Sequence, residues 1–252
     1  MGDGAAQATA EDGEQTLMRW LASRDSIYQA VGAPWPTSLP SHQRAWLYDG
    51  LAARRVEHTS NLLLLSITWS GPRRISCVGL AGYEVTRPLT TATVEVRVGG
   101  VWQSPQALVI DGTTAALALA PGDVTGVRLT LNTGVSGTVH RVGEVLLGDA
   151  LELPEPSTIE ETTTVPVVVN GDFATRVGVP IREFRLGWPP QDGRVIEEWV
   201  RQYGGESGLL WVDGRPLFVR LGTTITALRT IDHEFRELAA VTLTELEGAS
   251  LW

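Results

Sequence analysis

The sequence contains no lysine, only one cysteine and no long apolar run. Each of these features excludes some classes of protein function. All 20 basic residues of the 252-residue chain are arginines, against 29 acidic residues, so the net charge is −9. An acidic chain lacks the broad basic face that a nucleic acid or an anionic membrane attracts. We therefore expect no sequence-specific nucleic-acid binding.

With Cys77 as its one cysteine, the chain cannot form an intramolecular disulfide, so it is not a disulfide-stapled secreted module. Cys77 lies in the apolar run Ile75–Val78. A cysteine in such a run is typically a small buried hydrophobe, and we expect that role here rather than that of a nucleophile.

No segment has the length and apolarity of a transmembrane helix, since the longest apolar run, Leu62–Leu65, is the size of a strand. The first residues are small and acidic and do not resemble a signal peptide. These features predict a protein that works without membrane insertion.

Catalytic and cofactor motifs are also missing. The four histidines (His42, His58, His140 and His233) are not spaced as metal ligands. Gly134–Gly137 lacks the spacing and the following helix of a nucleophile elbow, and no glycine-rich phosphate loop occurs. The sequence thus predicts a protein that is not an enzyme and that has no metal, no cofactor and no catalytic residues.

What the chain does contain is a series of short strands with turn residues between them. In one segment Val94, Val96 and Val98 alternate with Thr93, Glu95 and Arg97, and Val127–Leu131 repeats the pattern with Arg128 and Thr130 on the polar face. This period of two indicates strands buried on one side. Residues 41–153 are predicted to form an antiparallel jelly-roll sandwich. The expected strands are Leu62–Thr68, Ile75–Leu80, Ala92–Val98, Ala107–Ile110, Ala115–Leu119, Gly126–Leu131 and Val142–Leu147.

Residues 1–40 are predicted to form a tail and an arm. Leu17, Leu21, Arg24 and Tyr28 fall at helical spacing, which predicts a short helix within Glu14–Ala30. The prolines of Ala33–Pro36 then favour an extended arm. Such an arm either packs on its own domain or reaches a neighbouring subunit.

A second domain is predicted over residues 165–252, after a linker at 154–164 that is rich in proline, glutamate and threonine. Val195, Ile196, Trp199, Val200 and Tyr203 form one apolar stripe, which predicts a helix that begins near Asp192 and ends at Gly204. Strands on both sides of this helix predict a small β-barrel-like domain with one packed helix. The overall fold class is therefore mainly β.

Tryptophan is abundant, with nine in the chain. Most are expected in the core, but tryptophan is also enriched at contact surfaces. Trp35 lies between two prolines and Trp102 lies in a turn-rich segment. These two residues are the candidate contact or interface residues.

The first domain resembles the discoidin-like, or galactose-binding-like, jelly roll over roughly residues 41–150. The resemblance rests on the turn Leu47–Gly50, the strand Ile75–Leu80 with Gly82 after it, and the closing strands Val127–Leu131 and Val142–Leu147. Members of this family often bind glycans through loops, so the resemblance implies a jelly roll and a glycan as an expected ligand.

A second resemblance concerns tail proteins of long-tailed bacteriophages. The segment Arg141–Pro154 resembles a sequence segment that is common in those proteins at the point where a jelly roll leads into a second domain. The helix Val195–Tyr203, the aromatic hairpin Leu209–Phe218 and the closing strand Ala240–Glu245 are similar to tail-tube and hub domains. The resemblance implies a distal-tail or hub-like subunit that forms a ring, a trimer or a hexamer, with other tail and baseplate proteins.

The leading hypothesis is thus a structural component of a phage tail or baseplate, a ring-forming adaptor between tail tube and tip proteins. Such a protein would assemble in the host cytoplasm and reside in the virion. The alternative is a carbohydrate-binding module that attaches to host glycans. A hydrolase whose site is assembled from scattered residues is a third and weaker hypothesis.

Overall fold

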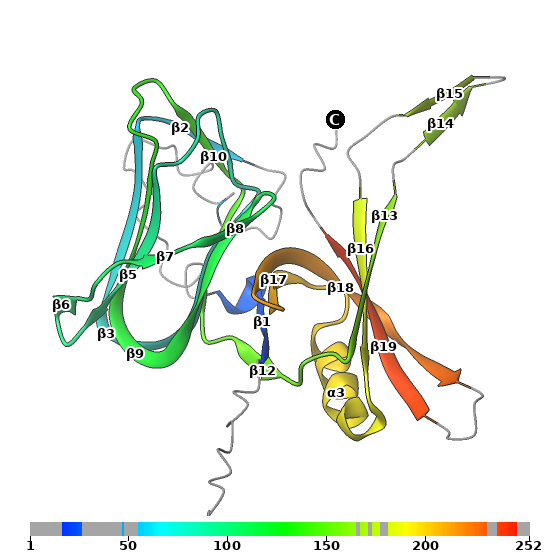
Figure 1. Ribbon diagram of the computed structural model, residues 1–252. Helices are drawn as coiled ribbons and strands as arrows, with labels where there is room; N and C mark the ends of the chain where they lie inside the picture. Colours follow the sequence, from blue (N-terminus) through cyan, green and yellow to red (C-terminus); the bar gives the residue numbers. More distant parts are fainter. Residues whose placement is uncertain are drawn as a thin grey trace, which may run out of the picture.

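Two large antiparallel sheets dominate the molecule, and one α-helix packs on the second of them (Figure 1). This confirms the predicted mainly β fold class. The computed structural model describes residues 17–26, 47, 55–164, 167–170, 173–176, 181–230 and 236–245.

The first sheet is built around two unusually long strands, β3 (Leu62–Ala81) and β9 (Thr114–Asn132), which pair with each other over most of their length. Both curve strongly (Figure 1), and their register shifts twice, between Thr68 and Arg73 and between Ile75 and Cys77. Leu62–Thr68 and Ile75–Leu80 are therefore one bent strand and not the two predicted strands, because irregular pairing bends a strand without ending it.

Shorter strands complete this part of the molecule. The other members of the first sheet are β5 (Thr91–Val98), β6 (Val101–Trp102), β7 (Gln106–Ala107), β8 (Val109–Asp111) and β11 (Glu144–Gly148). A small three-stranded sheet contains β2 (Val56–Thr59), β4 (Glu84–Val85) and β10 (Val139–Val142).

The bend brings the two halves of β3 onto one hydrophobic core. Leu63, Leu65 and Ile67 come from its first half and Val78 and Leu80 from its second, and all five side chains belong to the same buried cluster. The predicted alternation holds in β9, where Val127, Leu129 and Leu131 are fully buried. The result is a β sandwich formed largely by one folded sheet.

A buried polar pair lies beside this core. His140 of β10 is fully buried, its Nε2 lies 3.1 Å from the Ser60 carbonyl oxygen, and its Nδ1 lies 3.1 Å from the Tyr83 hydroxyl. Since a carbonyl only accepts hydrogen bonds, Nε2–H donates to Ser60 and Nδ1 accepts from Tyr83. Burial lowers the pKa of His140 below 6.5 and favours this neutral form.

The second sheet has seven strands in the order β12, β1, β17, β18, β19, β16, β13. In the described residues β12 and β13 do not pair with each other, so the sheet is open and lacks the closure of the predicted barrel-like domain. Its strands are β1 (Met18–Ala22), β12 (Leu151–Leu153), β13 (Thr158–Thr164), β16 (Ile181–Trp188), β17 (Ser207–Val212), β18 (Arg215–Thr230) and β19 (Arg236–Glu245).

The predicted N-terminal helix is wrong within the described residues. Met18–Ala22 is strand β1, held between β12 and β17, and a single 3-10 turn, η1 (Ser23–Asp25), follows it. A strand buried on both faces loses the alternating pattern, so its apolar residues can fall at helical spacing by chance. The expected arm at Ala33–Pro36 lies outside the described residues.

The predicted linker at 154–164 is also corrected in part, since Thr158–Thr164 is strand β13 and pairs with β16 over seven residues. Threonine is a good strand former, and a strand exposed on both faces needs no apolar side chain. The composition of such an edge strand is the same as that of a solvated linker. The division of the chain into domains at this segment stays a prediction.

The predicted helix is confirmed as α3 (Gly193–Tyr203), preceded by the 3-10 turn η3 (Pro190–Asp192). It ends where Gly204 N–H donates to the Val200 carbonyl. Ile196, Trp199, Val200 and Tyr203 are buried against the second sheet as expected, but Val195 is 46% exposed. Beyond β13 a separate hairpin, β14 (Val167–Asn170) and β15 (Phe173–Arg176), extends away from both sheets (Figure 1).

A third hydrophobic cluster joins the two sheets. From the second sheet it takes the large side chains of Leu21, Leu209 and Phe218, and from the first it takes Cys77, Ala81, Ala116 and Leu146. Ala150, which lies between β11 and β12, completes the cluster. Glycines let these groups approach closely, because a Cβ on Gly79 would lie 2.9 Å from both Ala116 Cβ and Leu209 Cδ2. The sheets are thus packed on each other directly.

Gly79→Ala should lower the free energy of unfolding by about 1–3 kcal/mol, because the added methyl group overpacks this contact. Chemical denaturation measures the change. Gly71→Ala is the matched control, since nothing lies within 4 Å of a Cβ there. Equal losses of unfolding free energy in the two variants would show that the contact between the sheets accommodates the added methyl group.

Stability should fall as the pH drops below about 6.5, because the unfolded chain then binds a proton that the neutral, buried His140 excludes. One proton contributes at most about 1.4 kcal/mol per pH unit. Urea unfolding at several pH values measures this slope. His140→Gln should flatten it, and an unchanged slope in that variant would refute the assignment.

Candidate binding surface

Trp102 lies on the outer face of the first sheet, at the end of a tight hairpin. Strand β6 folds back on β5 through Gly99 and Gly100, whose φ angles of 56° and 85° suit glycine. This pairing places Trp102 opposite Arg97, on the face away from the sandwich core. The indole is partly exposed.

Gly126, which has no side chain, and the charged Arg128 position the indole of Trp102. A Cβ on Gly126 would lie 3.3 Å from the ring edge, so this glycine leaves the space that the ring occupies. The guanidinium carbon of Arg128 lies 4.1 Å from the ring centroid, a cation–π contact. Arg128 is itself paired with Glu95 at 3.4 Å. The ring is therefore held in place on a rigid sheet.

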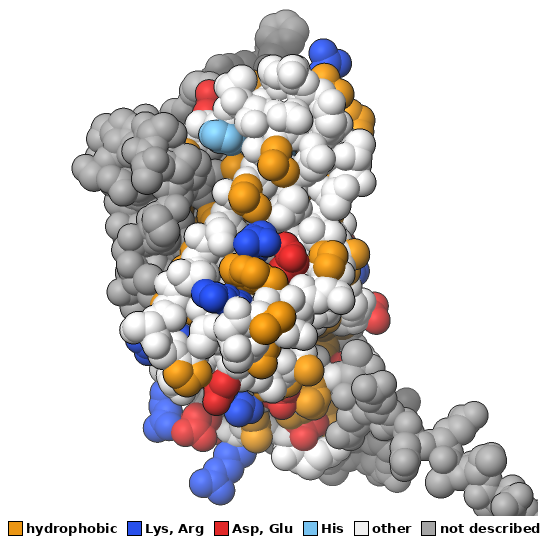
Figure 2. Space-filling model, turned by 90° about the vertical axis from the view of Figure 1, so that its left-hand side faces the viewer, with side chains coloured by type: hydrophobic (Ala, Val, Ile, Leu, Met, Phe, Trp, Pro, Cys, Tyr) orange, Lys and Arg blue, Asp and Glu red, His pale blue; other side chains and the backbone are white. Residues whose placement is uncertain are grey.

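The rest of this face is mostly hydroxylated. In β3, β9 and β5 the rows beside Trp102 place Ser66 next to Arg128 and Thr130 next to Thr93. Leu64, 46% exposed, ends one of these rows. Figure 2 shows this side of the molecule, where hydrophobic, basic and acidic side chains meet in the middle of the face.

Arg97 is a basic group of this face that has no acidic partner among the residues the structure describes. Its Nε donates a 2.9 Å hydrogen bond to the Gly100 carbonyl, which fixes the side chain along the hairpin. Among the described residues no carboxylate forms an ion pair with it. Its two terminal nitrogens therefore stay available for a ligand beside Trp102.

Of the two contact residues that the sequence singles out, only Trp102 can be placed, since Trp35 lies outside the described residues. The assignment of Trp102 to a contact stays a prediction. Alternation along the strands predicts the outward direction of Glu95, Arg97 and Arg128. Their gathering around Trp102 depends on strand register, for which the sequence gives no signal.

A second exposed feature is the edge strand β13, all seven of whose side chains are exposed. A cluster of charged groups anchors it: Arg182 pairs with Glu161 at 3.6 Å and with the buried Glu245. Arg215 Nε lies 2.7 Å from Asp111 Oδ2. Because Asp111 belongs to β8 of the first sheet, this cluster ties the edge strand to both sheets.

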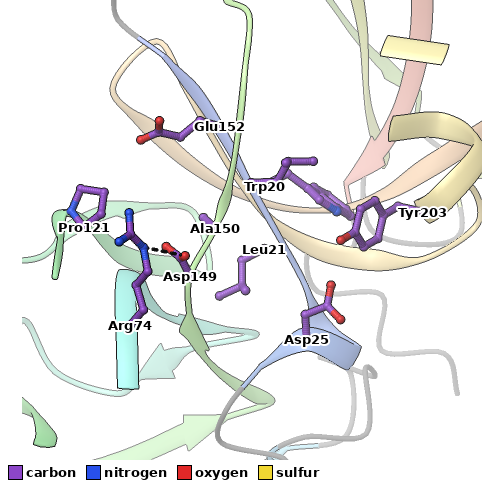
Figure 3. Close-up of a pocket in the computed structure, with 10 residues that line it drawn as sticks. Trp20, Leu21, Asp25, Arg74, Pro121, Asp149, Ala150, Glu152 and Tyr203 are labelled. Carbon is purple, nitrogen blue, oxygen red and sulfur yellow. Dashed lines mark ion pairs between the residues drawn. The ribbon is translucent and has the colours of Figure 1, made fainter. Parts of the chain in front are cut away.

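A cleft of about 470 Å³ lies at the seam between the sheets (Figure 3). Trp20 and Tyr203 lie on one side of it, and Pro121 lies on the other. Arginines pair with its three carboxylates: Arg74 with Asp149 at 2.9 Å, Arg19 with Glu152 at 3.5 Å and Arg24 with Asp25 at 4.0 Å. With its charges already matched, the cleft is less suited to a charged ligand than the face around Trp102.

One group that could carry chemistry, the Cys77 thiol, is unsuited to it. Cys77 is buried as expected, and burial raises the pKa of its thiol to about 12, so the reactive thiolate does not form near neutral pH. Within the described residues no three His, Cys, Asp or Glu side chains are grouped to hold a metal ion. The described part of the chain has no helix long and apolar enough to span a membrane.

Comparisons with known proteins place these surfaces in no known family. No family model matches the sequence, and no curated protein matches it. Among solved structures, a mutant of chitosan-binding module 1 from a chitosanase/glucanase of Paenibacillus sp. IK-5 is similar over 41% of this chain and 81% of that chain. Its identity is 14% and its TM-score 0.32. A similarity this low establishes neither a shared fold nor a shared function.

Proposed function

We propose that the protein is a non-catalytic structural subunit that assembles through the β13 edge of its second sheet. The observation that carries this proposal is the exposure of all seven residues of β13. One side of β13 pairs with β16, and in the described residues its other side has no partner strand. The backbone groups on that side form a ready template for another strand.

Proteins that stay monomeric usually protect such an edge with charged side chains, especially lysine, with a proline, with a bulge or by keeping the strand very short. β13 has the sequence Thr-Ile-Glu-Glu-Thr-Thr-Thr, pairs with β16 without a register shift, and contains no proline and no lysine; its charged side chains are Glu160 and Glu161. The anchoring of Glu161 by Arg182 and Arg215 keeps the edge in one position. A preorganised edge loses little conformational freedom when a partner strand binds.

The charges of β13 argue for a partner surface different from β13 itself. A two-fold antiparallel pairing centred on this strand would place Glu161 opposite Glu161 of the second copy, and like charges directly opposite are destabilising. A pairing between two different surfaces is heterologous, and repeated heterologous contacts close into a ring when the rotation between neighbouring subunits closes. The β14–β15 hairpin, which projects from the same side, is placed to reach a neighbour.

A ring-forming subunit of this kind fits the role that the resemblance to tail proteins implies. In this proposal the protein is a distal-tail or baseplate adaptor of a long-tailed bacteriophage, assembled in the host cytoplasm and carried in the virion. Its partners are further copies of itself, as a trimer or hexamer, and the adjoining tail proteins.

Consecutive proline substitutions test the edge. Successive N–H groups of an edge strand point alternately to the neighbouring strand and to solvent, so one of Thr162→Pro and Thr163→Pro removes an outward donor. That variant should keep the wild-type melting temperature within a few degrees and lose its assembled form. The other should be the less stable, because it breaks the pairing with β16.

Light scattering and negative-stain images of the wild-type protein and of both variants measure the outcome. Assembly that survives in both variants would show that β13 is not the interface. A wild-type protein that stays monomeric at high concentration and does not bind tail-tube proteins would refute the proposal as a whole.

A second candidate function, carbohydrate binding, is favoured by one observation: Trp102 presents an indole on a rigid, hydroxyl-rich face. Aromatic rings with a few fixed polar groups are typical of small-ligand sites. If this function is correct, Trp102→Ala should abolish binding to every positive glycan of an array without changing the circular dichroism spectrum. Binding that Trp102→Ala leaves intact would place the site elsewhere, and an array without positives would refute the candidate.

A further inference from the structure

We propose that the face around Trp102 binds a pyranose sugar that carries a carboxylate, such as a uronic acid residue of an acidic glycan. This inference rests on the second candidate function and names its ligand class. Four residues carry it: Trp102 as the platform, Arg97 as the anion-binding group, and the pair of Arg128 and Glu95 that fixes the platform.

The indole of Trp102 forms a platform on a continuous sheet. The hairpin places Trp102 on strands β5, β9 and β3, whose pairing is continuous beside it. Arg128 stacks against the indole, and its Nε is buried without a hydrogen-bond partner, as expected of a group covered by a ring. An indole fixed in this way keeps its orientation when a ligand arrives, so binding needs little reorganisation.

Among the described residues, the charged side chains next to Trp102 on this face are Arg97, Arg128 and Glu95, and Arg128 already pairs with Glu95. Arg97 is left as a positive charge without an ion-pair partner among the described residues. On a chain whose net charge is −9, such a local excess of positive charge favours an anionic ligand.

Arg97 lies close enough to Trp102 to share a ligand with it. Arg97 and Trp102 are opposite residues in an antiparallel pair, so their Cβ atoms lie about 5 Å apart. A sugar ring stacked on the indole would therefore have its ring substituents within reach of the Arg97 guanidinium. The fork of N–H donors in a guanidinium matches a carboxylate, and the hydrogen bonds are charge-assisted.

The hydroxyl groups around the platform favour a sugar over a protein partner. Ser66, Thr93 and Thr130 lie in the neighbouring rows of the same face. A protein interface of standard size would instead have an apolar centre with several aromatic anchors. Here one indole lies beside small polar side chains and the exposed Leu62 and Leu64, rather than among several aromatic anchors, an arrangement that suits a ligand of one or a few sugar rings.

Isothermal titration calorimetry with two matched probes tests the inference. The probes are oligogalacturonate and the same oligomer with its carboxylates methyl-esterified. Because a hydrogen bond to a charged group contributes about 1.5–3 kcal/mol, the acidic oligomer should bind at least about tenfold more tightly than the ester. This preference should shrink as salt is added, because salt screens exposed charges.

Substitutions at Trp102 and Arg97 separate the stacking role of the indole from the anion-binding role of the guanidinium. Trp102→Ala should abolish binding of both probes, whereas Arg97→Gln should remove the preference and leave ester binding unchanged. Arg87→Gln, which makes the same charge change in the exposed loop between β4 and β5, should leave both affinities at the wild-type value.

Equal affinity of the wild-type protein for the two probes would overturn the acidic-sugar inference and leave carbohydrate binding standing. Binding of neither probe would overturn the inference, and an array without positives would then remove the candidate function with it. If Trp102→Ala changes the oligomeric state measured by light scattering, the face is a protein interface and the inference is wrong.

Discussion

The contact on which the rest of the structure depends is the packing of the two sheets through the cluster around Leu209 and Phe218. Large side chains of the second sheet meet Gly79, Ala81 and Ala116 of the first, and the absence of larger groups there sets the distance between the sheets. Packed interiors resist both cavities and overpacking, so this contact fixes one arrangement. The charged cluster of Arg182 and Asp111 forms only because the sheets are held in that arrangement.

Much of the fold could be predicted from periodicity. The alternation in Val127–Leu131 identifies a half-buried strand, and the stripe of α3 identifies its buried face. In Thr93–Val98 the alternation holds for the buried Val94 and the partly buried Val96, but Val98 is 43% exposed. The sequence-based predictions are wrong for strands whose side chains are buried on both faces of the sheet or exposed on both faces. Met18–Ala22 is buried on both faces and Thr158–Thr164 on neither, so neither segment shows a period of two.

The candidate site could be predicted only residue by residue. A tryptophan in a glycine-rich turn indicates exposure, and alternation indicates that Glu95, Arg97 and Arg128 point away from the core. Whether these side chains meet depends on the register of β5, β6 and β9, which long-range pairing decides. Gly126 shows the same limit, since only the folded sheet reveals that its missing side chain makes room for the Trp102 ring.

The two proposed functions use different parts of the chain because of how the sheets are packed. The contact between the sheets buries Leu209 and Ala116 at their meeting faces, whereas Trp102 on the first sheet stays partly exposed and the β13 edge of the second stays exposed. A subunit that assembled through β13 would therefore keep the Trp102 face available to a ligand. Repeating that face around a ring would also multiply weak contacts, since linked sites raise the effective ligand concentration. Assembly and sugar binding are thus compatible in one molecule, and the first would strengthen the second.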